Sequence, residues 1–233
     1  MSSIRLCVMD MAGTTVEDVD FVAQALCTAF AQHGIPLDTS AANAKMGIPK
    51  PEAIRQILTE AGFGPGPDTE KLVHILHRDF ENLMCAFYAS DPRVKAKPDA
   101  EACFEQLRRA GLQIFLDTGF SRAIAEIILE RLGWKTSGIL DGSITSDEVA
   151  QGRPAPDMIF KAMRLCRIED SGAVAKVGDT VSDLQEGTAA GCGLVIGITT
   201  GAQDANLLKT APHTHLCASL TEATQIILER RAG

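Results

Sequence analysis

Short apolar runs with the composition of β-strands alternate with helical patterns along most of this chain of 233 residues. The runs are rich in branched residues and comprise Ile4–Asp10, Leu112–Asp117, Val174–Gly178, Leu194–Ile198 and His215–Cys217. The helical segments carry apolar residues about every 3.6 positions between capping residues, and they comprise Asp99–Arg109, Ser121–Leu132 and Pro156–Cys166. Because strands that alternate with helices pair in parallel, we predict an α/β fold in which helices cover both faces of one parallel sheet.

One block, from about Glu17 to Ala89, breaks the alternation because it is helical throughout and directly follows the first strand. Its expected helices are Phe21–His33, Pro51–Ala61 and Thr69–Ala89. The glycine- and proline-rich segment 62–67 neither follows a strand nor ends in Lys-Ser/Thr, so we predict a linker there rather than a phosphate-binding loop. The interruption predicts an α-helical cap domain at residues 17–91, inserted into a core domain formed by residues 1–16 and 92–233.

The composition is that of an acidic globular protein, with a net charge of −8 and 45% hydrophobic residues. The average field repels nucleic acids and anionic membranes, so neither is an expected partner, although a local cationic pocket is compatible with this charge. The N-terminal residues lack the basic segment and apolar run of a secretion signal, and no stretch approaches membrane-spanning length, so we expect a cytoplasmic protein. The seven cysteines include no CxxC pair, so neither disulfides nor a zinc site is expected.

Polar residues follow several of the predicted strands, at the sheet edge where ligands bind in open parallel sheets. Asp10 ends the first strand, and the backbone amides of the following turn, Gly13-Thr14-Thr15, could surround an anion. Thr118 and Gly119 end another strand and place a hydroxyl and amides beside a phosphoryl group. Each feature, taken alone, is also compatible with an ordinary turn.

A third turn, Gly152-Arg153-Pro154, precedes a predicted helix. Its arginine offers a fixed charge and forked donors for phosphoryl oxygens, although a surface arginine in a turn is the competing interpretation.

The segment from Val177 to Asp183 is the most informative of these strand ends, because two carboxylates, Asp179 and Asp183, follow a strand. Ser182-x-x-Gln185 has the pattern of a capping box that opens the next helix. A strand-end aspartate facing Asp10 would supply the hard oxygen ligands that Mg²⁺ prefers, with waters and a substrate phosphate completing the octahedron. Which of the two aspartates contacts the metal directly is left open by the sequence.

Ala12 stands two residues after Asp10, where many phosphate-transferring sites carry a second carboxylic acid that protonates the leaving oxygen. A methyl group donates no proton. Either the leaving group needs no such proton, or the proton comes from elsewhere.

The ordered motifs Asp-x-Ala-Gly-Thr, Thr-Gly, Gly-Arg-Pro and Val-Gly-Asp-Thr-Val-Ser-Asp resemble those of the haloacid dehalogenase superfamily of phosphohydrolases over nearly the whole chain. Ala12, and Arg153 where most members carry lysine, resemble the phosphonoacetaldehyde hydrolase branch, which cleaves a carbon–phosphorus bond. The resemblance implies a Rossmann-like core, a dimer through the cap helices, and Mg²⁺ at Asp10, Ala12, Asp179 and Asp183. The substrate-binding residues that it implies are Ala12, Met46, Gly47, Thr118, Gly119 and Arg153.

This branch is also implied to need a cap lysine that forms a Schiff base with the substrate aldehyde, and Met46-Gly47-Ile48-Pro49-Lys50 matches its segment. Independently of the resemblance, Pro51 restricts Lys50 to extended backbone and fits the first helical position, which predicts Lys50 as the helix N-cap. The positive end of the helix dipole there favours the neutral amine, while Glu52 in the same turn works against it. A Gly-x-Pro segment before a helix is also common without a catalytic lysine.

A Schiff base would explain Ala12, because the leaving group then departs as an enamine with no oxygen to protonate. Asp10 would accept the phosphoryl group, and Thr118 would lie beside that group. Arg153 and Mg²⁺ would offset the negative charge of the phosphoryl group, and water would then hydrolyse the aspartyl phosphate. We predict a hydrolase that cleaves the C–P bond of a small 2-oxoalkylphosphonate. The alternatives are a phosphomonoesterase and a non-catalytic sensor of a phosphorylated metabolite.

Two positions depart from the branch. Its described members carry a histidine three residues past the lysine, where this chain has Ala53, and a cysteine where it has Asp20. The missing histidine removes a proton shuttle, and Asp20, if close to Lys50, would raise the pKa of that lysine. A sister enzyme with another substrate is therefore also compatible with the sequence.

Overall fold

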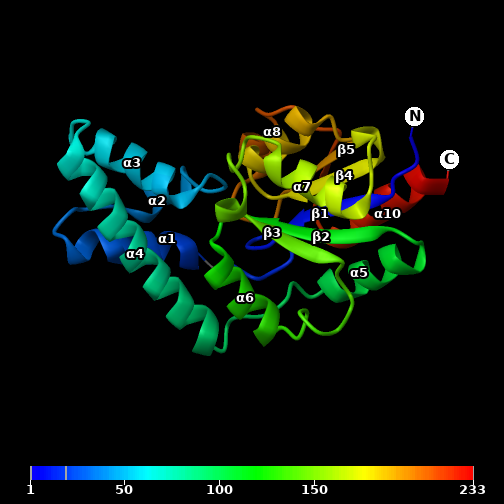
Figure 1. The fold of residues 1–233 in the computed structure, drawn as a ribbon, viewed down its shortest axis with the longest axis horizontal. Helices are drawn as coiled ribbons and strands as arrows, with labels where there is room; N and C mark the ends of the chain where they lie inside the picture. The colour runs from blue at the N-terminus through cyan, green and yellow to red at the C-terminus, as the bar shows by residue number, and fades with distance from the viewer. Residues whose placement is uncertain (1, 19, 233) are drawn as a thin grey trace.

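The computed structural model describes residues 2–18 and 20–232. Six parallel strands form one sheet in the order β3-β2-β1-β4-β5-β6 (Figure 1). The strands are β1 Leu6–Asp10, β2 Gln113–Thr118, β3 Gly142–Thr145, β4 Val174–Gly178, β5 Leu194–Ile198 and β6 His215–Cys217. The predicted α/β fold is confirmed, and β1 lies between β2 and β4, so the ends of these three strands are side by side.

Helices cover both faces of the sheet (Figure 1). They are α5 Ala100–Arg109, α6 Arg122–Arg131, α7 Asp157–Cys166, α8 Val181–Ala190, α9 Ala205–Leu208 and α10 Leu220–Ala232, with short 3₁₀ turns at Ser146–Glu148 and Ser171–Ala173. Successive side chains of β1 point to opposite faces of the sheet, as in any strand. Cys7 and Met9 pack in one apolar cluster with α5 and α10, whereas Leu6 and Val8 pack in another with α7.

The sequence missed β3, because its four residues, Gly-Ser-Ile-Thr, contain a single large apolar side chain and lie at the edge of the sheet. The predicted capping box at Ser182 and Gln185 is wrong by two residues. Thr180 is the N-cap of α8, and its hydroxyl accepts from the amide of Asp183, whose carboxylate accepts in turn from the amide of Thr180 at 3.1 Å.

Within the described residues between 20 and 91, every regular element is a helix: α1 Phe21–Gln32, α2 Thr39–Asn43, α3 Lys50–Glu60 and α4 Pro67–Ser90. These helices lie together beside the sheet (Figure 1). The long helix α4 has a stripe of buried residues spaced three or four apart that packs against α1 and α3, and the stripe consists of Val73, Leu76, Phe80, Met84 and Tyr88. None of the described helices has both the length and the apolar character needed to span a bilayer.

Lys50 is the first residue of α3 and Pro49 is its N-cap, so the predicted start of this helix is wrong by one residue. The segment that leads into α3 lies directly against the sheet edge. A Cβ atom at Gly47, whose φ is +84°, would lie 2.3 Å from Thr180 Oγ1, and one at Gly152 would lie 2.7 Å from Pro49 Cγ. Glycine at both positions therefore lets residues 47–49 sit between the β4–α8 loop and the loop that carries Arg153.

The variant Gly47→Ala should lose more stability than Gly62→Ala. Both glycines are in the left-handed region, with φ of +84° and +91°, and alanine there costs about 1–2 kcal/mol. No atom lies within 4 Å of a Cβ at Gly62, whereas Gly47→Ala also collides with Thr180. Urea unfolding compares the two free energies, and equal losses would contradict the close contact at Gly47.

Candidate active site

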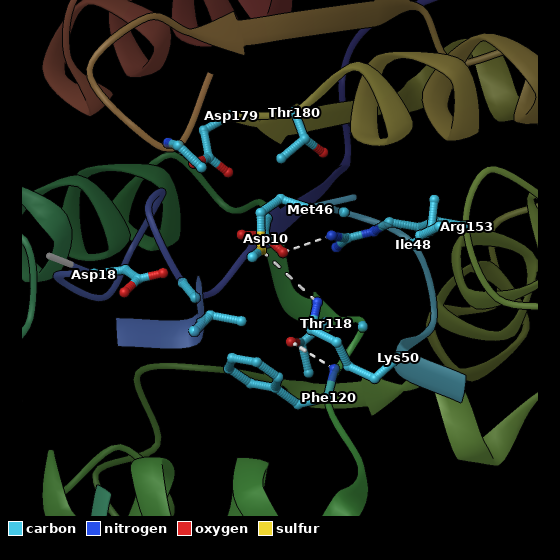
Figure 2. Close-up of a pocket in the computed structure, with 15 residues that line it drawn as sticks. Asp10, Asp18, Met46, Ile48, Lys50, Thr118, Phe120, Arg153, Asp179 and Thr180 are labelled. Atoms are coloured by element: carbon cyan, nitrogen blue, oxygen red, sulfur yellow. Dashed lines mark hydrogen bonds and ion pairs between the residues drawn. The ribbon is translucent and has the colours of Figure 1, made fainter. Parts of the chain in front are cut away.

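A pocket lies where the ends of β1, β2 and β4 meet the segment before α3 (Figure 2). All the predicted site residues except Asp183 line this pocket, namely Asp10, Ala12, Met46, Gly47, Lys50, Thr118, Gly119, Arg153 and Asp179. Asp183 is fully buried behind it. The pocket therefore brings together residues of the sheet edge and of the helical insertion.

Asp10 presents its carboxylate at the base of the pocket and is only 5% exposed. Its Oδ1 accepts from Arg153 Nη1 at 2.6 Å, which leaves Oδ2 as the other reactive oxygen. Burial raises the pKa of Asp10 to about 7, with Arg153 acting against the rise and Asp183 adding to it.

The backbone amides of Gly13, Thr14 and Thr15, which we expected to bind an anion, donate to backbone carbonyl oxygens instead. The amide of Gly13 donates to the carbonyl oxygen of Val16, and those of Thr14 and Thr15 donate to that of Met11, at 2.9 to 3.2 Å. The prediction is therefore wrong for these three amides. The turn instead supports Asp179, because the Thr14 hydroxyl donates to Asp179 Oδ1 at 3.2 Å and a Cβ at Gly13 would overlap Oδ2.

Arg153 is buried among carboxylates from the strands β1 and β2 and from α8. Its Nε lies 3.0 Å from Glu186 Oε2 and its Nη2 lies 2.6 Å from Asp117 Oδ1. Its Nη1 lies 2.6 Å from Asp10 and 2.9 Å from Asp183. Although burial opposes the charge, these acids raise the pKa of Arg153, so its positive charge is fixed beside the carboxylate of Asp10.

Lys176 is a second buried cation, which the sequence analysis missed together with Asp117 and Glu186. Its Nζ lies 2.6 Å from Asp117 Oδ1, 2.9 Å from Glu186 and 3.2 Å from Asp183. The available signal was a lysine inside the otherwise apolar β4 strand, since a fully buried lysine needs acidic partners. Glu186 lies three residues after Asp183 on α8, so both carboxylates reach the same cluster.

Three carboxylates could hold a metal ion, because Asp10, Asp117 and Asp183 each have an oxygen within 4.8 Å of the others. Burial would raise the pKa of Asp117, yet Arg153 and Lys176 lower it to about 2, so its charge is already paired. Asp183 Oδ1 is buried and lies 2.9 Å from Arg153 Nη1 and 3.2 Å from Lys176 Nζ, but it accepts no hydrogen bond among the described residues. An oxygen of this kind beside Asp10 fits a hard divalent cation.

Asp179 lies outside that group of three, although the sequence predicted it as a ligand. Its Oδ2 accepts from the amide of Ala202 at 2.6 Å. Burial, with the charges of Asp10 and Asp183, raises its pKa well above the usual range. The five buried acids named here share only two buried cations, Arg153 and Lys176. A divalent cation would therefore relieve the remaining repulsion between the carboxylates.

Lys50 faces the same pocket from α3 but has no carboxylate partner among the described residues. It is 5% exposed, and its Nζ lies 3.9 Å from Met46 Sδ (Figure 2). Burial lowers the pKa of Lys50 to about 8, with Asp18 and then Asp10 acting in the opposite direction. The Glu52 carboxylate is instead paired with Arg55.

Within the helical insertion, Asp18 rather than Asp20 is the acid whose charge raises the pKa of Lys50. Asp18 lines the pocket, whereas Asp20 is exposed and accepts from Asn43 Nδ2 at 3.3 Å. The sequence analysis missed Asp18. Two acids two positions apart before a helix gave no signal of which one faces inward.

Comparison with known proteins gives sequence relatives along the whole chain. A family model for haloacid dehalogenase-like hydrolases matches residues 4–191. A phosphonoacetaldehyde hydrolase of Bacteroides fragilis is 31% identical over 240 residues, which cover 99% of this chain and 89% of the relative.

Two solved structures illustrate the likeness of fold. A phosphonoacetaldehyde hydrolase-like protein from Oleispira antarctica has a TM-score of 0.84 at 19% identity, covering 99% of this chain and 94% of the other. A predicted phosphoglycolate phosphatase from Haemophilus somnus has a TM-score of 0.78 at 16% identity, covering 97% and 99%. At these identities the two structures support the fold alone.

The two buried lysines should respond in opposite ways to replacement by methionine. Lys176→Met leaves Asp117, Asp183 and Glu186 without one of their two cations, so the free energy of unfolding should fall by about 3–5 kcal/mol. Lys50→Met removes a buried amine that lacks an acidic partner, so the free energy of unfolding should rise by about 1–2 kcal/mol. Urea unfolding measures both, and a loss of stability in Lys50→Met would contradict the unpaired environment.

Proposed function

We propose that this chain, which belongs to the haloacid dehalogenase-like hydrolase family and to its phosphonoacetaldehyde hydrolase-like branch, hydrolyses the C–P bond of a small 2-oxoalkylphosphonate. The observation that carries the proposal is Lys50, a buried amine with its pKa lowered to about 8, in one pocket with the carboxylate of Asp10. A neutral amine is the form that attacks a carbonyl carbon. A carboxylate is the form that attacks phosphorus.

The first step that we propose is Schiff-base formation. Lys50 Nζ forms a bond to the carbonyl carbon, and the carbonyl oxygen leaves as water after taking one proton from the amine and one from solvent. The product is an iminium whose carbon is two bonds from phosphorus. Met46 and Gly47 line the pocket beside this amine, which makes them the proposed contacts to the carbon end of the substrate.

The second step is transfer of the phosphoryl group. Asp10 Oδ2 attacks phosphorus while Arg153 holds Oδ1, and the electron pair of the C–P bond moves into the iminium to give an enamine. No oxygen is released, so the methyl group of Ala12 suffices where an acid would otherwise stand. Water then hydrolyses the aspartyl phosphate.

Thr118 and Gly119 are the proposed contacts to the phosphoryl oxygens. The Thr118 hydroxyl accepts from the amide of Phe120 at 3.2 Å, so its own proton is free to donate to the substrate. Arg153 adds a fixed positive charge at the same end of the pocket.

Mg²⁺ is the cation that we propose for this site, held by Asp10 and Asp183 with Ala12 and Asp179 beside them. When bound, it would supply positive charge that offsets the charge on the transferring phosphoryl group. Two observations support this assignment: Oδ1 of Asp183 accepts no hydrogen bond among the described residues, and the buried carboxylates outnumber the buried cations.

Three broader assignments are also proposals. Residues 17–91 would form the cap domain over a core of residues 1–16 and 92–233, two copies would associate through the cap helices, and the protein would act in the cytoplasm on a small phosphonate or phosphate. The packing of α1 and α3 on α4 supports the first. The other two rest on the resemblance and on the sequence.

A phosphomonoesterase is the second candidate function. The pocket contains a half-buried carboxyl group, Asp18, that could give a leaving alkoxide the proton that Ala12 cannot supply. Phosphate release from monoesters but not from phosphonates would select this alternative. Release that vanishes in Asp10→Asn would exclude a non-catalytic sensor.

Lys50→Arg should abolish C–P cleavage and covalent trapping. With 2-oxopropylphosphonate and borohydride, the unmodified chain should gain the mass of the reduced adduct on the peptide that contains Lys50. Because arginine forms no Schiff base, Lys50→Arg should show no adduct and a loss of phosphonate turnover on the order of 10³-fold or more.

Lys45→Arg is the matched control for this experiment, because Lys45 lies on the same segment but pairs with Glu60 at 2.6 Å. It should label and turn over like the unmodified chain. Phosphonate turnover that survives in Lys50→Arg would rule out the Schiff-base mechanism.

The rate of trapping should depend on pH through Lys50. Lowering the pH protonates the amine, so the rate should fall about tenfold per pH unit below about 8 and should level off above it. Timed borohydride quenching followed by mass spectrometry gives this profile. A rate that continues to rise toward the pKa of an ordinary lysine would contradict a buried, neutral amine.

A further inference from the structure

The proposed function leaves one proton unaccounted for. After the C–P bond breaks, an enamine remains on Lys50, and its terminal carbon must gain a proton before the carbonyl product can leave. A group in the pocket has to deliver that proton. The following inference rests on the proposed function.

Five titratable side chains line the pocket, and four of them are unsuited to this task. Asp10 carries the phosphoryl group, and Lys50 is bonded to the substrate. Arg153 keeps its proton because each of its nitrogens faces a carboxylate. Both oxygens of Asp179 accept hydrogen bonds, from Thr14 and Ala202. The fifth side chain is Asp18.

We propose that Asp18 is the acid that protonates the enamine carbon. The proton leaves the Asp18 carboxyl group, and the enamine electron pair forms the new C–H bond, which gives a carboxylate and an iminium on Lys50. Water adds to the iminium, the carbonyl product departs, the amine of Lys50 is regenerated, and the proton released returns to the Asp18 carboxylate. Atoms and charge balance without a further reactant.

The geometry suits a proton donor that faces Lys50 across the pocket. Figure 2 shows Asp18 and Lys50 extending from opposite sides, with Asp10 between them in this view. The amide of Phe21 donates to Asp18 Oδ1 at 2.8 Å, which fixes the carboxyl group at the start of α1 and leaves Oδ2 to carry the proton. Asp18 is also the acid with the largest influence on the charge of Lys50, ahead of Asp10.

The surroundings of Asp18 couple its proton to the state of Lys50. The groups that face it are Lys50 from α3, Tyr88 from α4, Asp20 from its own segment, and the amides at the start of α1. Burial raises the pKa of Asp18, while those amides and the Lys50 ammonium lower it. Conversion of Lys50 to an uncharged enamine removes the ammonium, so the acid form is favoured at the stage that needs it.

Tyr88 is a second polar group near Asp18, although it does not line the pocket. Its hydroxyl is fully buried and has no hydrogen-bond partner among the described residues. After burial, the charge that most affects it is that of Asp18. An unused hydroxyl near this carboxyl group is suited to stabilising the carboxylate that forms once the proton has gone.

Asp18→Asn tests the assignment, because asparagine keeps an oxygen for the amide of Phe21 but carries no acidic proton. Rapid-quench experiments with 2-oxopropylphosphonate should show a phosphate burst of one equivalent per site, since C–P cleavage comes first. Steady-state release of the carbonyl product should then fall by about 10²–10⁴-fold. Asp18→Glu should recover part of the rate, and Asp18→Ser, which can still cap α1, should behave like Asp18→Asn.

Asp20→Asn is the matched control, because Asp20 lies two residues away, is exposed and does not line the pocket. It should match the unmodified chain. Turnover of Asp18→Asn within about twofold of the unmodified chain would overturn the assignment, as would loss of the phosphate burst in parallel with product. If the unmodified chain cleaves no phosphonate, both the proposed function and this inference fail. If it cleaves phosphonate and replacement of Asp18 leaves turnover unchanged, this inference alone is rejected.

Discussion

Two cations and five carboxyl groups share a buried volume where β1, β2 and β4 end, and the arrangement of the pocket depends on this unequal balance. Removing carboxylates from water is costly unless cations and hydrogen bonds compensate. Arg153 and Lys176 hold the pKa of Asp117 at about 2, but they cannot do the same for every acid around them. Burial raises the pKa of Asp10 to about 7, with the charge of Asp183 adding to the rise and Arg153 acting against it. The surplus of negative charge makes this end of the pocket a place for a divalent cation.

Lys50 and Lys176 are both buried, but their surroundings shift their pKa values in opposite directions. Lys176 is fully buried, and its acidic partners outweigh burial and raise its pKa. Lys50 is nearly as buried but meets the sulfur of Met46 instead of a carboxylate, so burial lowers its pKa. One amine therefore serves as a permanent charge inside the sheet, and the other is available as a nucleophile. Gly47 positions the second amine by letting its segment lie against Thr180.

The sequence predicted the features that depend on local order along the chain. Asp10, Thr118 and Asp179 were predicted to share one pocket because they follow parallel strands, which end at a common edge. The sequence did not predict the features that depend on partners far apart along the chain. The pairing of Lys176 with Asp117 and Glu186 joins residues from two strands and a helix. The different positions of Asp18 and Asp20 also could not be predicted: Asp20 has a left-handed backbone, with φ of 58°, and its side chain accepts from Asn43 outside the pocket.

The central claim is that burial opposite the carboxylate floor of the pocket lowers the pKa of Lys50, so that its neutral amine becomes available near pH 8. An NMR titration of the Lys50 ε-carbon resonance, assigned by its absence in Lys50→Arg, measures this directly in the free protein. The account predicts a midpoint at about pH 8. A midpoint at the ordinary value for lysine, about 10.4, would mean that the amine is solvated and charged, and it would contradict the account.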